Sequence, residues 1–210
     1  MQTRLLSVVA ILGAVVLAAL MWVGPASAQA KMSHGQSEMQ ARKIWSAADE
    51  LRRRGKWETA VKAYQKSLEV LALSGGEKTT LGMAATQMIE LCEAMPFDVK
   101  QVADGEYEAQ AWGYFAQIKV KVTVKGGKIR NFHILEHKET RPKGLEIVPR
   151  LIYKKQSPSV DAVTNATVTS YGLMTATLRA LQKGKTDSGT KDATDTKKDA
   201  EKDPKEPAED

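Results

Sequence analysis

The spacing of apolar residues changes from a helical to a strand period near the middle of the chain. Over residues 36–93, apolar residues recur at i, i+3, i+4 and i+7, which is the spacing of one helix face. Over residues 118–124, Ile and Val alternate strictly with Lys and Thr, as in a half-buried strand. Helices followed by strands are typical of an α+β domain, here with a small antiparallel sheet and flanking helices.

The helical region, residues 31–97, is predicted to contain three helices. Breaks fall at Arg54-Gly55-Lys56, at Ser74-Gly75-Gly76 and at Met95-Pro96. A Gly at the first break, followed by Trp57, Ala60 and Tyr64, resembles the pattern of a tetratricopeptide helical hairpin. Only one such unit is visible, and about three repeats are needed for a stable array. We therefore expect a helical hairpin followed by a third helix.

The second region, residues 98–182, is predicted to hold the sheet. A strand is expected over residues 107–114. A hairpin follows, with strands over residues 118–124 and 129–135 joined at Gly126-Gly127. A short helix is expected over residues 147–153 and a longer one over residues 171–181.

The two ends of the chain have the composition of segments outside a folded domain. Residues 1–30 combine Arg4, a long apolar run and the small-x-small site Ala26-Ser27-Ala28, which predict a signal peptide or an N-terminal anchor. We therefore expect an exported protein, periplasmic or anchored to the membrane with the domain outside the cytoplasm. Residues 183–210 contain no Leu, Ile, Val or aromatic residue, and they are predicted to be a disordered charged tail.

Composition narrows the kind of function. The single Cys, Cys92, excludes a CxxC metal or haem motif, and we expect it to be a packed core residue. Three scattered His residues argue against a metal site, and none is expected. Aromatic residues make up only 6% of the chain, so we expect no nucleic-acid partner that stacks on them. Residues 31–182 are basic, which suits an anionic ligand.

The chemistry is concentrated in residues 161–170, which read DAVTNATVTS and lead into the last predicted helix. A helix N-terminus leaves backbone N–H groups unpaired and carries a partial positive charge, so it favours phosphate. The alternative is a plain loop in which Thr167, Thr169 or Ser170 caps the helix. These ten residues alone leave both interpretations open.

Further positions of the second region follow a known pattern. They are Asp104-Gly105, Tyr107, Gly113-Tyr114, residues 118–124, Gly127-Lys128-Ile129, His137, Glu139-Thr140, Ile147, Pro149, Gln156-Ser157 and residues 161–170. In this order and spacing, the chain from about residue 104 to residue 181 resembles the FMN-binding domain of exported electron-transfer flavoproteins. Examples are the flavin subunits of sodium-pumping quinone reductases and of related membrane reductase complexes.

The resemblance implies a covalent flavin. In that family the signature is Asp-x-x-Ser/Thr-Gly-Ala-Thr/Ser, and its last hydroxyl carries FMN through a phosphoester bond. Here Asp161 opens the signature, Thr164 takes the Ser/Thr place, Ala166 the Ala, and Thr167 is the acceptor. The implied partners are a flavin transferase, which moves FMN from FAD with Mg²⁺, and a redox partner protein at or near the membrane.

The cofactor site implied by this resemblance includes residues around the acceptor as well. The full set is Asp161, Thr164, Asn165, Ala166, Thr167, Thr169, Ser170, Glu139 and Thr140.

Two positions depart from the family pattern. Asn165 replaces the family's Gly, and Asn is the side chain best able to follow a Gly with a positive φ. The family's Glu-Thr-Pro-Gly loop, which lies near the flavin ring, is longer and more basic here, with Arg141 and Lys143.

Three functions follow as hypotheses. The first is an exported electron-transfer flavoprotein with FMN on Thr167. The second keeps the fold but binds FMN without a covalent bond, or binds no flavin. The third is an interaction module that docks a partner through the helical hairpin. A stand-alone reductase is less expected than an electron carrier, because the chain has no G-x-G-x-x-G dinucleotide fingerprint.

Overall fold

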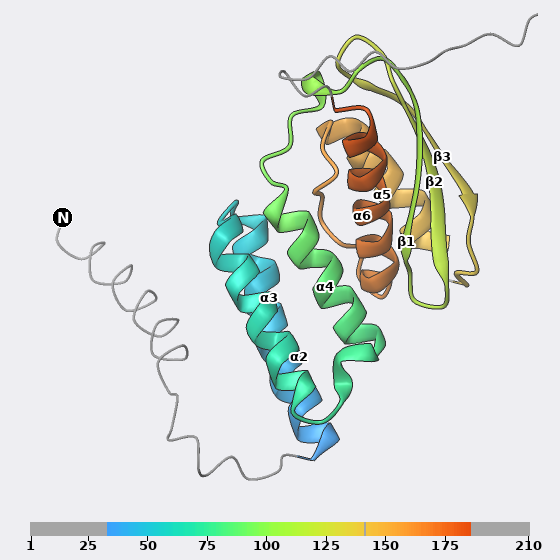
Figure 1. Cartoon of the computed structure of the whole chain (residues 1–210). Coiled ribbons are helices and arrows are strands. Elements are labelled where there is room, and N and C mark those ends of the chain that lie inside the picture. The colour runs from blue at the N-terminus through green and yellow to red at the C-terminus, as the bar shows by residue number, and fades with distance from the viewer. Residues whose placement is uncertain (1–32, 141, 186–210) are drawn as a thin grey trace, which may run out of the picture.

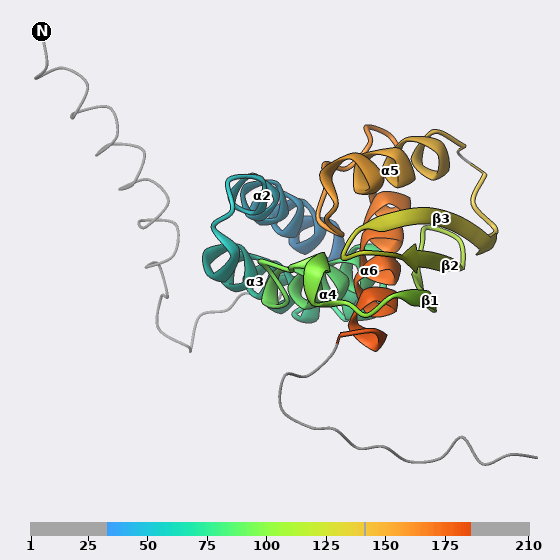
Figure 2. The same ribbon diagram turned by 90° about the horizontal axis from the view of Figure 1, so that it is seen from above.

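A computed structural model describes residues 33–140 and 142–185. The expected leader, Arg141 and nearly all of the expected tail lie outside these residues. The described chain forms three layers (Figures 1 and 2): a three-stranded antiparallel sheet, helices α5 and α6 against one face of it, and helices α2–α4 on the far side of α6. The predicted α+β fold class is therefore confirmed.

The first layer consists of three helices, as predicted. They are α2 (His34–Arg53), α3 (Trp57–Ala72) and α4 (Thr80–Glu93), with a short 3₁₀ turn η1 (Gly76–Lys78) before α4. A capping box of Ser33 and Gln36 starts α2, and Thr79 caps α4. Gly55 and Gly75 adopt φ of 71° and 70° in the two turns, a conformation open to Gly at little cost. The helix breaks therefore fall where the Gly residues predict them.

The sheet follows a second 3₁₀ turn, η2 (Val99–Gln101). Its strands are β1 (Gly105–Trp112), β2 (Gln117–Val124) and β3 (Ile129–Glu136), in the order β1-β2-β3. Gly126 and Gly127 have φ of 61° and 65°, as a two-residue turn with matching twist requires, so the predicted hairpin is confirmed. The four apolar residues of β2 are buried and its Lys and Thr residues face outward: Ile118, Val120, Val122 and Val124 are the buried ones.

Two helices differ from their predicted bounds. The short helix expected over residues 147–153 is the longer α5 (Pro142–Lys155). Pro142 opens it, which suits a residue without an N–H, and Pro149 lies inside it. The last helix, α6 (Thr167–Lys183), begins four residues before the predicted start at Tyr171. The Thr and Ser residues that were expected in a loop therefore form its first turn.

Helix α6 is the centre of the molecule. It contacts β1, β2, α4 and α5, and most of its side chains are buried. Gly172 allows the closest approach, because a Cβ there would lie 2.6 Å from the carbonyl oxygen of Trp112 at the end of β1. This contact holds the start of α6 beside the β1–β2 turn (Figure 1).

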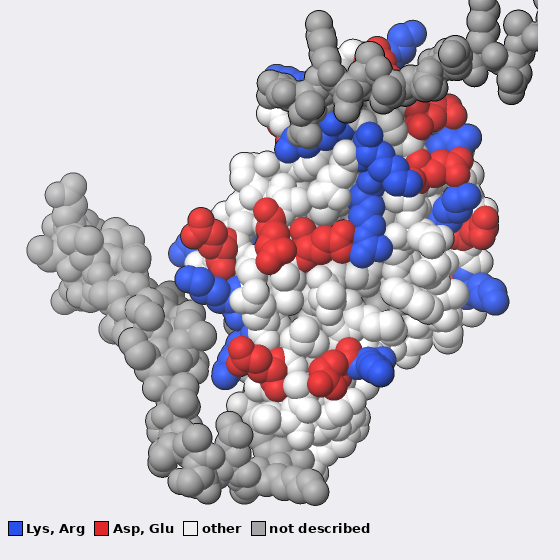
Figure 3. All heavy atoms as spheres, in the orientation of Figure 1, with Lys and Arg blue, Asp and Glu red and all other residues white. Residues whose placement is uncertain are grey.

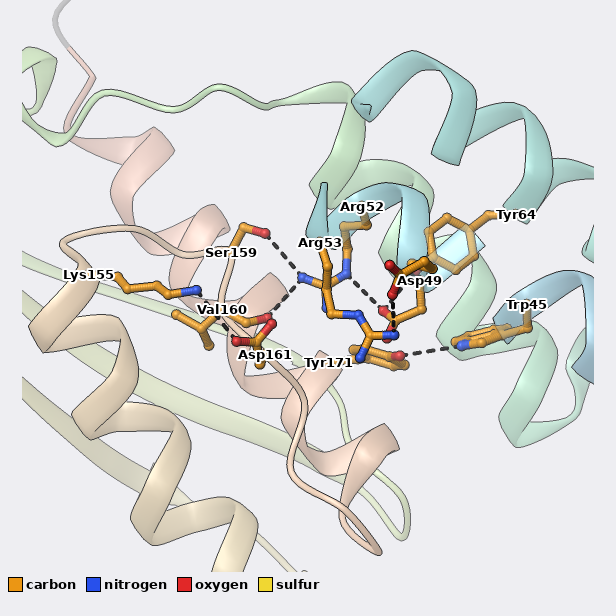
Figure 4. A network of polar contacts seen from close by, with 11 residues as sticks. Trp45, Asp49, Arg52, Arg53, Tyr64, Lys155, Ser159, Val160, Asp161 and Tyr171 are labelled. Carbon is orange, nitrogen blue, oxygen red and sulfur yellow. Dashed lines mark hydrogen bonds and ion pairs between the residues drawn. The ribbon is translucent and has the colours of Figure 1, made fainter. Parts of the chain in front are cut away.

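A buried polar network joins α2 to the loop before α6 (Figure 4). The guanidinium of Arg52 donates from Nε to Asp49 Oδ1 at 2.9 Å and from Nη1 to the Val160 carbonyl at 2.8 Å. Its Nη1 also lies 3.3 Å from Ser159 Oγ. Burial lowers the pKa of Arg52, but the carboxylate of Asp49 and the phenols of Tyr64 and Tyr171 together outweigh this effect, and the net pKa is raised. Arg52 is therefore a fully charged residue inside the protein.

Aromatic side chains continue this junction. Trp45 donates from Nε1 to the Tyr171 hydroxyl of α6 at 3.3 Å, and the two rings lie 5.5 Å apart. Tyr64 of α3 meets the other side of Trp45 edge-on at 5.3 Å. Burial raises the pKa of both Tyr64 and Tyr171, so both phenols remain neutral. One hydrophobic cluster thus includes residues of the helical region and of the sheet region.

Cys92 of α4 belongs to this same cluster. Burial raises the pKa of its thiol to about 12, which keeps it protonated and unreactive at neutral pH. Among the described residues, no helix is long and apolar enough to cross a membrane.

Candidate functional site

A hollow of about 240 Å³ lies at the N-terminal end of α6. Four separate parts of the chain surround it: α2, the β1–β2 turn, the loop between β3 and α5, and the segment that leads into α6 with its first turn. The lining residues are Arg42, Tyr114, Phe115, Glu139, Asn165, Ala166, Thr167, Val168 and Thr169. On the face shown in Figure 3, the surface near the β1–β2 turn carries few charged side chains.

Glu139 ties two walls of this hollow together. Its Oε1 accepts hydrogen bonds from the backbone N–H groups of Tyr114 at 2.8 Å and Phe115 at 3.1 Å. Its Oε2 accepts one from the Thr169 hydroxyl at 2.5 Å. Gly113 makes room for the carboxylate, because a Cβ there would lie 2.3 Å from Oε1. Both oxygens of this buried carboxylate are therefore engaged in positioning the turn and the helix.

The first turn of α6 has no side-chain cap. Its N-cap residue is Ala166, so the expectation that Thr167, Thr169 or Ser170 caps the helix is wrong. Ser170 instead stabilises the preceding loop, because its hydroxyl accepts from the Val163 N–H at 3.0 Å and donates to the Ala166 carbonyl at 2.8 Å. The N–H groups of the first turn and the partial positive charge of the helix are thus left at the hollow.

Thr167 is the first residue of α6, and its exposed side chain lines the hollow. Just before it, Asn165 adopts a φ of 65°, the left-handed region that Gly enters freely. The chain therefore makes the turn into α6 with Asn in the place where the family signature has Gly. Asn tolerates this conformation better than most residues, because its short polar side chain can bond locally.

A second, wider hollow of about 470 Å³ adjoins the first at Asn165 and Ala166. Its other lining residues are Thr140, Pro142, Lys143 and Thr164. Gly144 brings α5 close to this junction, where a Cβ would lie 3.0 Å from the Cβ of Ala166. Thr140 and the first residues of α5, with Lys143 among them, thus lie beside the segment that contains the signature.

The structure gathers most of the expected cofactor-binding residues at these two hollows. Thr140, Glu139, Thr164, Asn165, Ala166, Thr167 and Thr169 line one or both of them. Ser170 is buried behind the first hollow, in the loop contacts described above. Asp161 lies apart: its side chain is 59% exposed and it pairs with Lys155 of α5 at 3.6 Å.

Arg42 and Phe115 are lining residues that sequence reasoning missed. Arg42 lies more than 120 positions before Thr167, and the contact of Trp45 in α2 with Tyr171 in α6 brings the two segments together. Tyr114 and Phe115 are about half exposed, and their rings meet edge-on at 4.8 Å. Among the described residues, no group of three or more His, Cys, Asp and Glu residues is placed to hold a metal ion.

Comparison with known proteins agrees with this site. Residues 113–182 match the sequence model of the FMN-binding domain family. This match supports the predicted FMN-binding domain, and it indicates FMN as the cofactor. An uncharacterized protein of Treponema pallidum (strain Nichols) is 30% identical over 102 residues, which are 47% of this chain and 28% of that protein. The chain thus spans less than a third of the length of that relative.

Removal of the Glu139 side chain should loosen the site. We expect Glu139→Ala to lower the free energy of unfolding by about 2–3 kcal/mol, because it strips the acceptor from two backbone N–H groups. Glu139→Gln retains a carbonyl oxygen and should lose only about 1 kcal/mol. Urea unfolding measures both, with the exposed neighbour Glu136→Ala as the control. Equal stability of Glu139→Ala and wild type would show that the carboxylate does not hold the turn.

The backbone at Asn165 predicts a second pattern of stability. Asn165→Val should destabilise the protein by about 1–2 kcal/mol, since a β-branched residue is strained at a positive φ. Asn165→Gly should lie within about 0.5 kcal/mol of wild type. Thermal unfolding of these variants and of the neighbouring Thr164→Val makes the comparison. If Val were tolerated at 165 as well as at 164, the left-handed turn would be contradicted.

Proposed function

We propose that the protein carries FMN covalently, through a phosphoester bond to the hydroxyl of Thr167, and acts as an electron carrier. One observation supports this most: an exposed hydroxyl stands at the first position of a helix whose N-terminus has no side-chain cap. The acceptor atom and the N–H groups that favour a phosphate are therefore at the same place.

The residues present fit the remaining parts of FMN. The first-turn N–H groups suit the phosphate oxygens, and the half-exposed rings of Tyr114 and Phe115 offer apolar surface to an aromatic ring. Pockets that enclose a drug-sized ligand measure roughly 300–1,000 Å³. The hollow of about 240 Å³ is smaller, so much of the cofactor would extend into the adjoining hollow or to solvent. Bound FMN would supply the redox chemistry itself.

The described residues that line this hollow do not offer a base for the modification of Thr167. Formation of the phosphoester joins Thr167 Oγ1 to the flavin phosphorus of FAD, breaks the pyrophosphate bond and releases AMP, while the hydroxyl proton leaves. Among the described residues that line this hollow, Arg42, Tyr114 and Glu139 are the ionisable ones. Glu139 is the one carboxylate among them, and both of its oxygens already accept hydrogen bonds. This supports a separate flavin transferase with Mg²⁺ as the partner that activates the hydroxyl.

The sequence supports a proposal for the cellular setting. We propose export through the leader in residues 1–30, and electron exchange with a redox partner at or near the membrane, as the likeness to the flavin subunits of membrane reductases suggests. A covalent link would suit an exported carrier, because free cofactor would be lost by dilution. In this account the tetratricopeptide-like hairpin is part of the flavoprotein body, since Arg52 and Trp45 fasten it to the loop before α6 and to α6.

The attachment can be tested by co-expression. The full chain produced with a flavin transferase should be yellow, and the flavin should stay with the polypeptide after denaturation and gel filtration. The chain produced without the transferase should be colourless after the same treatment. Flavin that separates from the denatured chain in both cases would favour non-covalent binding instead.

A further inference from the structure

Arg42 lines the hollow at Thr167, although its helix lies outside residues 113–182, which match the FMN-binding domain family. It lies in α2, and its side chain lines both the hollow at Thr167 and a neighbouring one of about 290 Å³ that shares Tyr114 and Val168. Glu38, one turn earlier, accepts from Arg42 Nε at 3.1 Å and from Nη2 at 2.6 Å. The ion pair with Glu38 uses the Nε–Nη2 edge of the guanidinium, and Nη1 takes no part in it.

The contact between two helices brings Arg42 and Thr167 to the same hollow. Arg42 and Trp45 are three residues apart, so they lie on one face of α2. Thr167 and Tyr171 are four residues apart, so they lie on one face of α6. The contact between Trp45 and Tyr171 joins these two faces, through a hydrogen bond of 3.3 Å and rings 5.5 Å apart. One turn before this contact along each helix, Arg42 and Thr167 line the same hollow.

The charges at this place favour an anion. The uncapped N-terminus of α6 is partly positive, and Arg42 brings a cation that is paired with Glu38 through Nε and Nη2 but not through Nη1. The carboxylate of Glu139 is engaged with two N–H groups and a hydroxyl, which compensates its charge locally. A guanidinium is well suited to phosphate oxygens, because its donors form a planar fork.

We propose that Arg42 binds the phosphate of FMN, so that the N-terminal helical segment completes the cofactor site. The inference rests on the proposed function, because it takes Thr167 as the attachment point. It gives α2 a direct role in holding the cofactor, in addition to its role in the core. It also predicts that Lys43, the next residue along α2, is dispensable for flavin binding, since it does not line the hollow.

The chain contains a matched control for this inference. Arg54 forms the same i,i+4 pair with Glu50 that Arg42 forms with Glu38, and the two side chains are 65% and 64% exposed. Arg54 lines none of the three hollows described above. Arg42→Gln and Arg54→Gln therefore remove surface ion pairs of the same spacing and similar exposure, although Glu50 keeps Arg53 as a second partner. Only the first removes a cation from the proposed phosphate site.

The experiment compares thermal unfolding of the full chain with and without attached FMN. We expect attached FMN to raise the unfolding temperature of wild type and Arg54→Gln equally, and that of Arg42→Gln by about half as much or less. The flavin-free chains should unfold alike. An equal gain in all three proteins would overturn the role of Arg42. Failure of wild type to take up any flavin would instead overturn the proposed function, and the inference with it.

Titration of the flavin-free chains separates contact with the phosphate from contact with the ring. Arg42→Gln should weaken binding of free FMN by about tenfold, the effect of one lost charged hydrogen bond, and leave riboflavin binding unchanged. An equal loss for FMN and riboflavin would place Arg42 at the ring and contradict the proposal. If wild type holds neither free flavin measurably, the comparison of unfolding temperatures decides alone.

Discussion

Thr167→Val should abolish covalent flavin attachment when the chain is co-expressed with a flavin transferase. The substitution replaces the hydroxyl with a methyl group of similar size, so no nucleophile towards phosphorus remains at this position. Because Thr167 is exposed and its hydroxyl does not cap α6, the free energy of unfolding of the flavin-free protein should change by at most about 0.5 kcal/mol. Flavin fluorescence of the denatured chain on a gel measures the attachment.

Two further variants, one at Thr167 itself and one at Thr169, make this result specific. Thr167→Ser restores the hydroxyl and should restore attachment. Thr169→Ser retains the donor to Glu139 and should remain fully flavinylated, although it lies within the same first turn. Flavin retained by denatured Thr167→Val at the wild-type level would contradict attachment at this residue.

Arg52→Ala should destabilise the protein more than Glu139→Ala or Asn165→Val. Arg52 has a side chain only 1% exposed, paired with Asp49, whose side chain is 16% exposed. Removal of the guanidinium leaves the Asp49 carboxylate and the Val160 carbonyl without their main partner. Breaking a buried pair in this way costs about 3–5 kcal/mol. Urea unfolding followed by circular dichroism should therefore show a large shift of the midpoint.

The next residue along α2 is the natural control. Arg53 pairs with Glu50 at 2.7 Å, but both side chains are nearly half exposed. Such surface pairs contribute about 0–1 kcal/mol, so Arg53→Ala should unfold close to wild type. Similar stability of Arg52→Ala and Arg53→Ala would show that the buried network in Figure 4 does not fasten α2 to the loop before α6.

Local sequence signals predicted much of the fold, for identifiable reasons. Gly55 and Gly75 predicted the helix breaks correctly because each lies in a turn and adopts a positive φ, which Gly does at little cost. The alternation of residues 118–124 reported a strand with one buried face, which β2 has. The start of α6 was predicted four residues late. Thr is typical of the cap before a helix, but Thr167 and Thr169 lie within α6.

The candidate site is formed by contacts between residues that are distant in the chain, which no local sequence pattern predicts. The family resemblance placed Glu139 and the residues around Thr167 in one site, and the hollows bring them together. Asp161 opens the signature in sequence but pairs with Lys155 away from the first hollow. Arg42 could not be predicted, because its position depends on the packing of Trp45 against Tyr171, 126 residues later in the chain. The apolar face of a helix predicts which residues are buried, but it does not predict which element they pack against.

The most direct test of the proposed function is the intact mass of the protein, purified from its own host and denatured. We expect a mass increase of one FMN less one water, and digestion should locate it on the peptide that contains Thr167. An unmodified mass, with free flavin in the supernatant or with none at all, would contradict covalent attachment. A flavin found on a peptide without Thr167 would contradict the assignment of the acceptor.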